Sequence, residues 1–589
     1  KGTYTGSDNR GIELTTNSTI DFANLKNVVI TSEEGAANTI IHANDQDRHF
    51  TISGNSSKTI DSTFQFIGLT FTGGKRTDHS GSFFIKSERY YDNNVNNNRA
   101  TLMQPKFTDC VFKDNQVINT SYGGYGGAFW IENAAPIFES CVFDSNYANA
   151  GGGAINAGGG SNVYRDTLWI RNSTFKNNWV DDANVTNNTN VRGGAIWLDH
   201  GMNIIIDKST FQNNSAIQKN ANHGLNGGAI AVENSWDTKV PGKIYISNSR
   251  FTKNEVRHEN GGNSHGGAIA VGAPFTMTNT LIDSNKAGVT SGQGGNRGHG
   301  GGLYIDINAK WDNQNEVKGT AYLINNTIVD NYVSGSGNQA GESGGVHIGD
   351  ANSIYGTWFN NIFWGNRSDS QETNQHNLSQ HGEDQFSIAS DYNDVEFSEH
   401  YPYMMGSNSY ELNPAFYSAT NYQLGTGSPL IGAGTSSFDG VTVPAKDILG
   451  NARPNPTGSK PDLGAYENAL EESPYPKQVK NLVGTFGSSQ VSLSWDANAE
   501  TDIDKYIVYA STVKDYTPAR TDSVGETTTT AYTVTGLTNN VEYHLRVAAV
   551  NKTGYEGSYS AQVSVIPKYD GPIWWVSAEA QTNSDGSKE

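Results

Sequence analysis

The stretch VRGGAIWLD, Val191 to Asp199, is one copy of a repeat that decides the fold of this chain. Its glycine pair recurs as GGAF at Gly126, GGAI at Gly152, Gly193, Gly227 and Gly266, GGGL at Gly300, and GGVH at Gly344. A second half of the repeat places an aromatic or aliphatic residue three positions before an asparagine, as FKDN, FDSN, FKNN, FQNN, FTKN, IDSN, IVDN and FWGN between Phe112 and Asn366. The glycine pairs lie about 26 to 44 residues apart, which indicates stacked supersecondary units.

The units are strands, because the segments after the glycine pairs are short and β-rich and no 3.6-residue period of useful length lies between them. We predict an all-β chain built on a right-handed parallel β-helix. Equivalent residues then stack at about 4.8 Å. The phenylalanines at 112, 143, 175, 211 and 251 form an interior ladder, and the asparagines from Asn115 to Asn366 form a ladder of amides. A β-propeller is the rival, but its four-stranded blades need more strand residues than these long loops leave.

The two cysteines, Cys110 and Cys141, each precede a ladder phenylalanine by two positions. Later copies hold small residues there, namely Ser173, Ser209, Ser249 and Thr280. We therefore expect the cysteines to be buried small side chains on adjacent coils. A disulfide is the alternative, although parallel Cβ vectors give it a poor torsion.

The composition excludes some partners. A net charge of −20 and the absence of a Lys/Arg run argue against nucleic acid and anionic membrane surfaces. No apolar stretch approaches the roughly 18 residues that a spanning helix needs, so we expect no membrane insertion in this segment. The first residues lack the apolar centre of a signal peptide, and we expect the parent chain to be longer.

The repeat ends in three motifs, GSPLIGAG (Gly427 to Gly434), DILGNARP (Asp447 to Pro454) and PDLGAYE (Pro461 to Glu467). Their order resembles the closing region of bacterial right-handed β-helix proteins of the choice-of-anchor Q type. The GGAI and FxxN halves resemble the repeats of chlamydial polymorphic outer-membrane proteins. These resemblances imply a secreted, surface-displayed bacterial protein, and they imply no particular activity. We place the β-helix at residues 1–468, with its closing region at 414–468.

A second domain follows a linker at residues 469–477. VSLSW (Val491 to Trp495), KYIVYA (Lys505 to Ala510), TAYTVTGL (Thr530 to Leu537) and EYHLRVAAVN (Glu542 to Asn551) alternate at period two between turn signals. They resemble a fibronectin type III domain, at residues 478–567, with Trp495 in its core and Leu537 and Tyr543 at its tyrosine corner. Residues 568–589 are expected to be a linker or the start of a further module.

One register, six residues after the first glycine of each pair, is rich in acids: it holds Glu132, Gly158, Asp199, Glu233, Gly272, Asp306 and Asp350. Adjacent coils then place Asp199 beside Glu233 and Asp306 beside Asp350. Carboxylates about 5 Å apart suit a Ca²⁺ site or the pair of a retaining glycosidase. Solvated acids at strand ends are the plainer interpretation, since like charges repel and water screens them. We predict that any bound metal is Ca²⁺ at these four acids, and we assign no catalytic residue.

Aromatic and histidine side chains are the remaining candidates for binding. Exposed Tyr90, Tyr91, Trp236 and Trp311 suit stacking on sugar rings, although a lone loop aromatic more often packs locally. Trp574 and Trp575 are expected to pack on a following module or a neighbouring copy. His223, His265 and His299 lie just before successive glycine pairs, where a metal site is possible, although histidines are common in polar loops.

Two functions remain at this stage. The favoured hypothesis is a non-enzymatic, extracellular or cell-surface structural or adhesive protein, whose rigid rod presents variable loops to glycans, protein partners or copies of itself. The alternative is a secreted carbohydrate-active enzyme, either a polysaccharide lyase or a glycosidase. A groove that gathers acids, a base and aromatic rings from neighbouring coils would distinguish the two.

Overall fold

The structure is a computed structural model, and it describes residues 2–14, 27–55, 59–92, 97–100, 102–158, 163–164, 167–186, 189–199, 202–219, 225–233, 242–290, 296–307, 310–312, 315–317, 319–336, 339–349, 354–370, 376–380, 388–401, 405–569 and 571. The chain divides into two compact units. The first holds Lys1–Glu411, Thr420–Gln423 and Gly432–Glu471, and the second holds Leu412–Ala419, Leu424–Ile431 and Glu472–Glu589.

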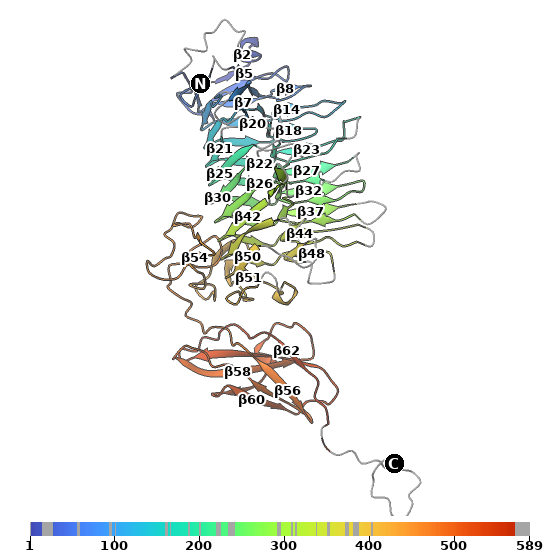
Figure 1. Ribbon diagram of the computed structural model, residues 1–589, viewed down its shortest axis with the longest axis vertical. Helices are drawn as coiled ribbons and strands as arrows, with labels where there is room; N and C mark the ends of the chain where they lie inside the picture. Colours follow the sequence, from blue (N-terminus) through green and yellow to red (C-terminus); the bar gives the residue numbers. More distant parts are fainter. Residues whose placement is uncertain are drawn as a thin grey trace, which may run out of the picture. The chain divides into compact units, whose positions relative to one another are not determined.

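The first unit is a parallel β-helix with three walls, as the fold prediction required (Figure 1). The first wall contains β3 (Val29–Thr31), β6 (Gln65–Ile67), β12 (Lys106–Thr108), β16 (Ile137–Glu139), β21 (Thr167–Arg171), β25 (Asn203–Asp207), β30 (Ile244–Ser247), β35 (Phe275–Thr278), β42 (Gly319–Ile324), β46 (Ile354–Phe359) and β50 (Ile388–Asp391). The second wall contains β1 (Gly2–Tyr4), β4 (Thr39–His42), β7 (Thr70–Thr72), β13 (Val111–Lys113), β17 (Val142–Asp144), β22 (Thr174–Lys176), β26 (Thr210–Gln212), β31 (Arg250–Thr252), β36 (Leu281–Asp283), β43 (Thr327–Val329), β47 (Ile362–Trp364) and β51 (Asp394–Val395).

The third wall follows the glycine pairs. It contains β2 (Ile12–Leu14), β5 (Phe50–Gly54), β9 (Phe83–Ser87), β15 (Phe129–Glu132), β19 (Ile155–Gly158), β24 (Ile196–Leu198), β29 (Ile230–Val232), β34 (Ile269–Val271), β39 (Leu303–Ile305), β45 (Val346–Ile348) and β49 (Leu378–Gln380).

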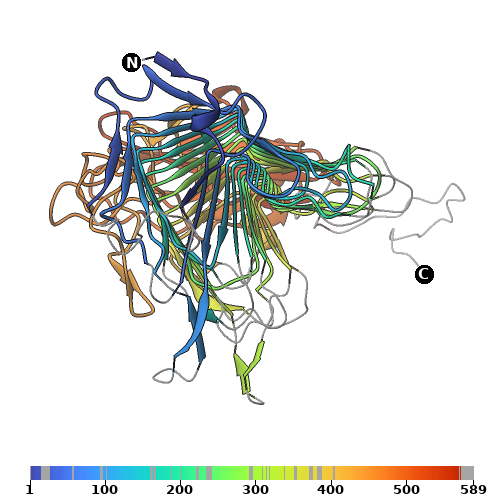
Figure 2. The same cartoon turned by 90° about the horizontal axis from the view of Figure 1, so that it is seen from above.

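Between the second and third walls most coils extend into an arm, which projects from the three-walled cross-section in Figure 2. Its main sheet contains β8 (Lys75–Arg76), β14 (Gln116–Val117), β18 (Tyr147–Ala148), β23 (Trp179–Asp181), β27 (Ser215–Gln218), β32 (Glu255–His258), β37 (Lys286–Val289), β44 (Tyr332–Val333) and β48 (Arg367–Ser368). The chain returns along β28 (Leu225–Asn226), β33 (Ser264–His265) and β38 (Gly298–His299). A small core of valine and alanine side chains fills the arm.

Shorter elements lie outside these sheets. They are β10 (Arg89–Asp92), β11 (Asn97–Ala100), β20 (Val163–Tyr164), β40 (Lys310–Asp312), β41 (Asn315–Val317), β52 (Phe416–Ser418), β53 (Asn421–Leu424), β54 (Ser437–Phe438), β55 (Val441–Thr442), η1 (Ser7–Asn9) and η5 (Ser398–His400). Among the described residues, no helix is long and apolar enough to cross a lipid bilayer.

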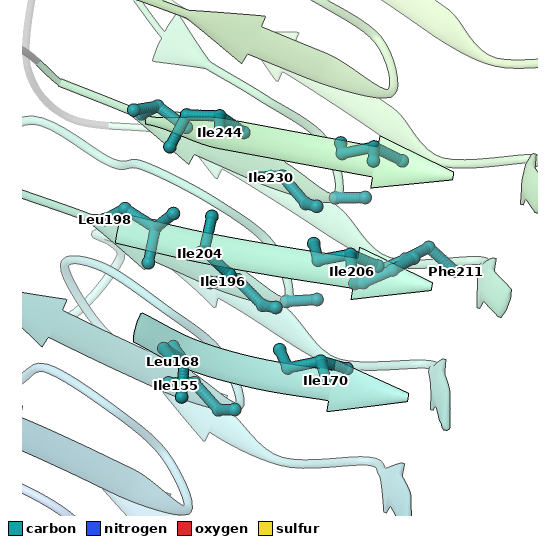
Figure 3. Packing of buried hydrophobic residues seen from close by; sticks show 14 of the residues in the cluster. Ile155, Leu168, Ile170, Ile196, Leu198, Ile204, Ile206, Phe211, Ile230 and Ile244 are labelled. Atoms are coloured by element: carbon teal, nitrogen blue, oxygen red, sulfur yellow. The ribbon is translucent and has the colours of Figure 1, made fainter. Parts of the chain in front are cut away.

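The predicted phenylalanine ladder is confirmed. Phe143 pairs in register with Phe175, and Phe175 with Phe211. All three side chains are fully buried, and their ring centroids lie 4.3 and 4.7 Å apart in nearly parallel planes. Figure 3 shows the isoleucines and leucines of the first and third walls, which point into the same interior as Phe211. The solenoid core is therefore one continuous stack.

The asparagine ladder runs beside it, also as predicted. Nδ2 of Asn178 donates to Oδ1 of Asn214 at 2.9 Å, and Nδ2 of Asn214 donates to Oδ1 of Asn254 at 2.9 Å. The same bond recurs at every step from Asn115 to Asn366. Each amide also donates to a main-chain carbonyl, for example Asn214 to Phe175. Burial of these amides is thus matched by hydrogen bonds.

The glycine pair has two separate physical causes, visible at Gly193 and Gly194. Gly193 has a φ of 61°, in the left-handed region that most residues avoid. A Cβ on Gly194 would lie 2.1 Å from the carbonyl oxygen of Gly228 in the next coil. The first glycine therefore turns the chain at the corner, and the second allows adjacent coils to approach.

The small-residue register behaves as expected. Cys110 and Cys141 are free and buried, and their thiols face main-chain carbonyls of Phe66 and Phe107. Burial raises the pKa of the Cys110 thiol to about 11, so this thiol is inert at neutral pH. The register continues in later coils as a second ladder of amides, Asn326, Asn361 and Asn393, which the repeat pattern did not reveal.

The closing region packs on the walls through buried polar groups. Arg453 and Glu467 form an ion pair at 3.0 Å, and both side chains are fully buried. The Arg453 guanidinium also donates to the carbonyls of Asp462 and Gly464. Nδ2 of Asn325, on the solenoid, donates to the same two carbonyls. The DILGNARP and PDLGAYE motifs therefore hold this loop region against the coils.

The second unit contains a fibronectin type III sandwich. One sheet holds β56 (Val483–Gly487), β57 (Gln490–Ser494) and β60 (Ala531–Thr535); the other holds β58 (Ile503–Ser511), β59 (Ser523–Thr527), β61 (Tyr543–Asn551) and β62 (Val563–Val565), and η7 (Arg520–Asp522) precedes β59. Trp495 and Leu537 lie in its core. The main-chain N–H of Thr538 donates to the Tyr543 hydroxyl at 3.2 Å, which forms the predicted tyrosine corner.

Candidate functional site

Two rows of outward side chains meet at the concave side of the glycine corner. The row before the corner holds His79, Tyr125, Gly151, Arg192, His265, His299 and Glu342, with the main chain of Asn226 between Arg192 and His265. The row after it holds Phe84, Trp130, Asn156, Trp197, Ala231, Ala270, Tyr304 and His347. Residues of the second row alternate with core residues, so they point away from the solenoid interior, although Asn156, Trp197 and His347 are themselves buried. We call the two rows together the corner surface.

The first half of the corner surface is aromatic. Tyr125 lies 6.2 Å from Trp130 and 5.3 Å from Trp197, between ring centroids, and His79 packs edge-on against Trp130. Gly151 makes room for this cluster, because a Cβ there would lie 2.3 Å from the Trp197 ring. The tryptophans come from coils separated by the Asn156 coil.

Two of these rings are held neutral. Burial lowers the pKa of His79 to about 3, so its imidazole is uncharged at neutral pH. Burial also raises the pKa of Tyr125, so its hydroxyl stays protonated. The surface therefore offers apolar ring faces with polar edges.

Charged groups border the rings. The Arg192 guanidinium lies 5.2 Å from the Trp197 ring centroid, and its Nη2 pairs with Oε1 of Glu233 at 3.0 Å. Leu198 and Val232 are paired in register, and Asp199 and Glu233 directly follow them. The two acids therefore occupy neighbouring positions on adjacent coils, as the sequence predicted. Both line a shallow depression with Met202.

The prediction of Ca²⁺ at this row stays a prediction. Glu132 and Glu233 each pair with a cation, Lys86 at 3.1 Å and Arg192 at 3.0 Å. Within the described residues, Asp199 and Glu233 do not belong to any group of three or more potential ligands. Two carboxylates are fewer oxygen ligands than Ca²⁺ requires, so loops or solvent would have to supply the rest.

The second predicted acid pair rests on a register that the structure corrects. Ile305 pairs with Ile348, so Gly349 is the neighbour of Asp306. The cause lies at the last corner, where Ser343, with a φ of 64°, occupies the position that the first glycine holds in other coils. The register must therefore be counted from Ser343 and not from Gly344. A side chain at position 349 would collide with Tyr304 and Asp306. Asp350 itself lies outside the described residues.

Most of the aromatic side chains predicted to bind a ligand are not among those that the structure describes. Trp236, Trp574 and Trp575 lie outside the described residues, as does His223. Tyr90 and Tyr91 lie on β10, and Trp311 lies on β40, but only the main chain is described there. The aromatic rings that the structure does gather are other ones, Tyr125, Trp130 and Trp197. The sequence signal for them was their constant distance from the glycine pair.

The second half of the corner surface gathers histidines and an acid. His265 stacks on His299 with centroids 5.2 Å apart, and His299 lies 4.7 Å from His347. Oε2 of Glu342 lies 3.3 Å from Nδ1 of His299 and 4.0 Å from Nδ1 of His347. The sequence placed His265 and His299 along one edge, but it missed Glu342 and His347. Their signal was again the position relative to the corner.

Comparisons with known proteins address the second unit and a short stretch of the chain. Residues 477–566 match the fibronectin type III domain family. An amylopullulanase of Thermoanaerobacter thermohydrosulfuricus is 32% identical over 112 residues, which are 18% of this chain and 7% of that enzyme, so the chain spans a small fraction of that relative.

Two solved structures are similar to a short part of the chain. An Fn3-like protein from Clostridium thermocellum is 24% identical, over 17% of this chain and 95% of that one, with a TM-score of 0.14. The sixth fibronectin type III domain of a human protein is 22% identical, over 17% of this chain and 92% of that one, with a TM-score of 0.14. A fibronectin type III domain is consistent with a structural or adhesive role.

Proposed function

We infer that this chain is a non-enzymatic, extracellular adhesive protein and that its corner surface binds glycans. The observation that carries the inference is the aromatic half of that surface, where Tyr125 and Trp130 of one coil lie beside Trp197, which comes from the second coil along. Trp130 and Trp197 are two coils apart, about 9.6 Å at the strand spacing. An extended polysaccharide can therefore contact the partly exposed Trp130 and reach the small exposed part of Trp197, which is 9% exposed, through different sugar units.

The chemistry of the surface suits sugars. Apolar faces of pyranose rings pack on indole and phenol rings, while their hydroxyls need hydrogen-bond partners. Asn156 lies between the two tryptophans in the row, and Arg192, Glu233 and Asp199 border them. Since Arg192 and Glu233 neutralise each other, the surface favours neutral over strongly charged polysaccharides.

The wider setting supports the same role. A rigid β-helix presents a repeated surface, and a fibronectin type III domain serves elsewhere as a spacer or binding module. The order of the DILGNARP and PDLGAYE motifs resembles that of bacterial surface proteins of the choice-of-anchor Q type. We propose a bacterial cell-surface location, with protein partners or self-association through the loops. Ca²⁺ at Asp199 and Glu233 is part of this proposal.

Affinity electrophoresis in gels containing neutral or acidic polysaccharides tests the binding. Retardation should be lost in Trp130→Ala and Trp197→Ala. The matched control is Trp179→Ala, because Trp179 is a partly exposed tryptophan on the arm that stacks on Tyr147 and does not belong to the corner surface. Equal retardation of the corner variants and the control would contradict glycan binding at this surface.

A second candidate is a carbohydrate-active enzyme. Asp199 and Glu233 lie on adjacent coils beside Arg192 and Tyr125, which combines two carboxylates, a cation and a hydroxyl. Adjacent coils lie about 4.8 Å apart, which is near the roughly 5 Å that separates the two carboxyl groups of a retaining glycosidase. Release of reducing ends from a polysaccharide, abolished in Asp199→Asn and Glu233→Gln but kept in Trp179→Ala, would establish the enzyme and displace the adhesive role.

A further inference from the structure

We propose that His299, Glu342 and His347 form a binding site for one divalent transition-metal ion of the Zn²⁺ class. Each of the three side chains offers one ligand atom, and these atoms all lie within 4.8 Å of one another. The proposal goes beyond glycan binding, because it concerns the other half of the corner surface.

The fold brings these residues together from two coils. His299 and Glu342 are bridge partners in the row before the corner. His347 lies in the row after the corner, where Tyr304 of the preceding coil is its partner. The left-handed corner residue Ser343 turns the chain, so that Glu342 and His347 face the same side. The site is therefore built by the corner itself, between the arm and the third wall.

The distances are close to those of a bound ion. Ligand atoms of a tetrahedral Zn²⁺ ion with bonds of about 2.0 to 2.2 Å lie about 3.3 to 3.6 Å apart. Oε2 of Glu342 is already 3.3 Å from Nδ1 of His299. His347 needs a shift of about an ångström, within the reach of a side-chain rotation.

All three side chains are buried: His299 is 4%, Glu342 7% and His347 0% exposed. Two imidazoles and a carboxylate gathered at one buried point offer several donor atoms to a single cation. The donor set identifies the class of ion. Imidazole nitrogens suit Zn²⁺, Ni²⁺, Co²⁺ and Cu²⁺, whereas Ca²⁺ and Mg²⁺ prefer oxygen ligands alone.

Neighbouring groups hold the three side chains in orientation. The Arg297 guanidinium pairs with Oε1 of Glu342 and leaves Oε2 facing the imidazoles. Nδ1 of His347 shares a hydrogen bond of 2.7 Å with Oγ of Ser379 on the next coil, so an ion bound at Nε2 would keep this bond and an ion bound at Nδ1 would replace it. The Tyr304 ring stacks on the His347 ring. Such outer partners are what fixes the ring orientation of metal-binding histidines. A bound ion would link two coils and stabilise this end of the solenoid.

The test uses the untagged full chain, treated with EDTA and then dialysed. Titration with ZnCl₂ by isothermal calorimetry should show one ion per chain, and Zn²⁺ should raise the melting temperature reversibly on chelation. CoCl₂ should produce visible absorption bands of an imidazole-containing site. CaCl₂ should produce neither effect.

Variants assign the ligands. His299→Ala and His347→Ala should weaken Zn²⁺ binding by more than the roughly 10- to 100-fold that loss of an outer partner costs. His265→Ala is the matched control, since His265 stacks on His299 in the same row but is not one of the three. It should keep the affinity of the unchanged chain.

Three results would overturn the proposal. The first is absence of stoichiometric Zn²⁺ binding and of cobalt bands in the unchanged chain, a result that does not depend on any variant folding. The second is unaltered affinity when His299 and His347 are both changed to alanine. The third is an equal loss of affinity in His265→Ala.

Discussion

The interior of the β-helix and its corner surface are made by the same coils, yet they differ in how much they vary. Inside, Phe143, Phe175 and Phe211 repeat one side chain with nearly identical ring spacing. At the corner, equivalent positions of one row carry different side chains, for example Tyr125, Arg192 and His299. Interior positions must satisfy the coil above and below, whereas corner positions must only face outward. The comparison teaches that the positions that repeat from coil to coil stabilise the fold, whereas the positions that differ between coils are the candidates for binding.

The largest expected effect breaks the interior. Gly194→Ala places a Cβ 2.1 Å from the Gly228 carbonyl oxygen and close to the Ser215 main chain. Two coils would have to separate, at a cost of about 5 kcal/mol or more. We expect loss of soluble protein, measured by yield and circular dichroism. Gly158→Ala is the control, because its nearest neighbour is the Asp199 side chain at 3.3 Å. Equal yields would refute this account of the second glycine.

The next effect removes one ring of the core stack. Phe175→Ala deletes a fully buried side chain between Phe143 and Phe211 and should destabilise by about 4 kcal/mol. A thermal melt should show the loss. Tyr245→Ala, on the outward face of β30 and 43% exposed, should change the melting temperature far less. Similar shifts in the two variants would mean that interior and exterior positions are not as distinct as we argue.

The amide ladder gives a somewhat smaller effect. Asn214→Ala removes the donors to Asn254 and Phe175 and the acceptor for the Asn178 main-chain N–H. These buried partners would be left unsatisfied, at a total cost of about 3 kcal/mol. Hydrogen exchange at the Asn178 amide should accelerate as well. Unchanged exchange there would show that the ladder contributes little to local stability.

An interior histidine makes stability depend on pH. Burial lowers the pKa of His49 to about 4, from the ordinary value of 6.5. The folded state thus binds fewer protons than the unfolded state, so the contribution is complete above pH 6.5 and is lost as the pH falls from 6.5 through 4, by about 3 kcal/mol.

The His49 ring lies 5.3 Å from Phe71 and 6.4 Å from Phe83, between centroids. His49→Phe keeps these ring contacts and removes the titrating group. Melting temperatures at pH 7 and pH 4 should differ less in this variant than in the unchanged chain. An identical acid limb would show that other groups control acid sensitivity.

The smallest expected effect lies on the corner surface. Glu233→Gln removes one charge of a partly exposed ion pair with Arg192, which is worth less than about 1 kcal/mol. The melting temperature should scarcely move, while retardation by polysaccharide changes. A large loss of stability would place Glu233 with the scaffold instead of the binding surface.

Much of the scaffold could be predicted from the sequence, because stacking places the same physical requirement on equivalent residues of every coil. Each corner needs one residue with a left-handed backbone conformation and one that passes close to the next coil. Glycine suits both positions, so the glycine pair recurs in the sequence. The phenylalanine, asparagine and small-residue registers follow for the same reason, as does the burial of Cys110 and Cys141. The fibronectin type III domain was also recognisable, from its alternating strands and its tyrosine corner.

The candidate sites were only partly readable. The neighbourhood of Asp199 and Glu233 followed from constant spacing, but the proposed pairing of Asp306 failed where Ser343 replaced a glycine and moved the register by one. The rings that gather at the corner were not those expected from loop positions. A linear pattern shows which residues share a row, but it does not show which two rows meet.

The sequence by itself thus determined a β-helix with interior ladders and glycine corners, and a fibronectin type III domain after it. The tertiary structure alone decided that the row before each corner touches the row after it. Trp130 and Tyr125 meet in this way, and so do Glu342 and His347. The physical reason is that interior contacts repeat with every coil and leave a periodic record, whereas contacts across the concave corner depend on backbone turns and loop lengths that leave none.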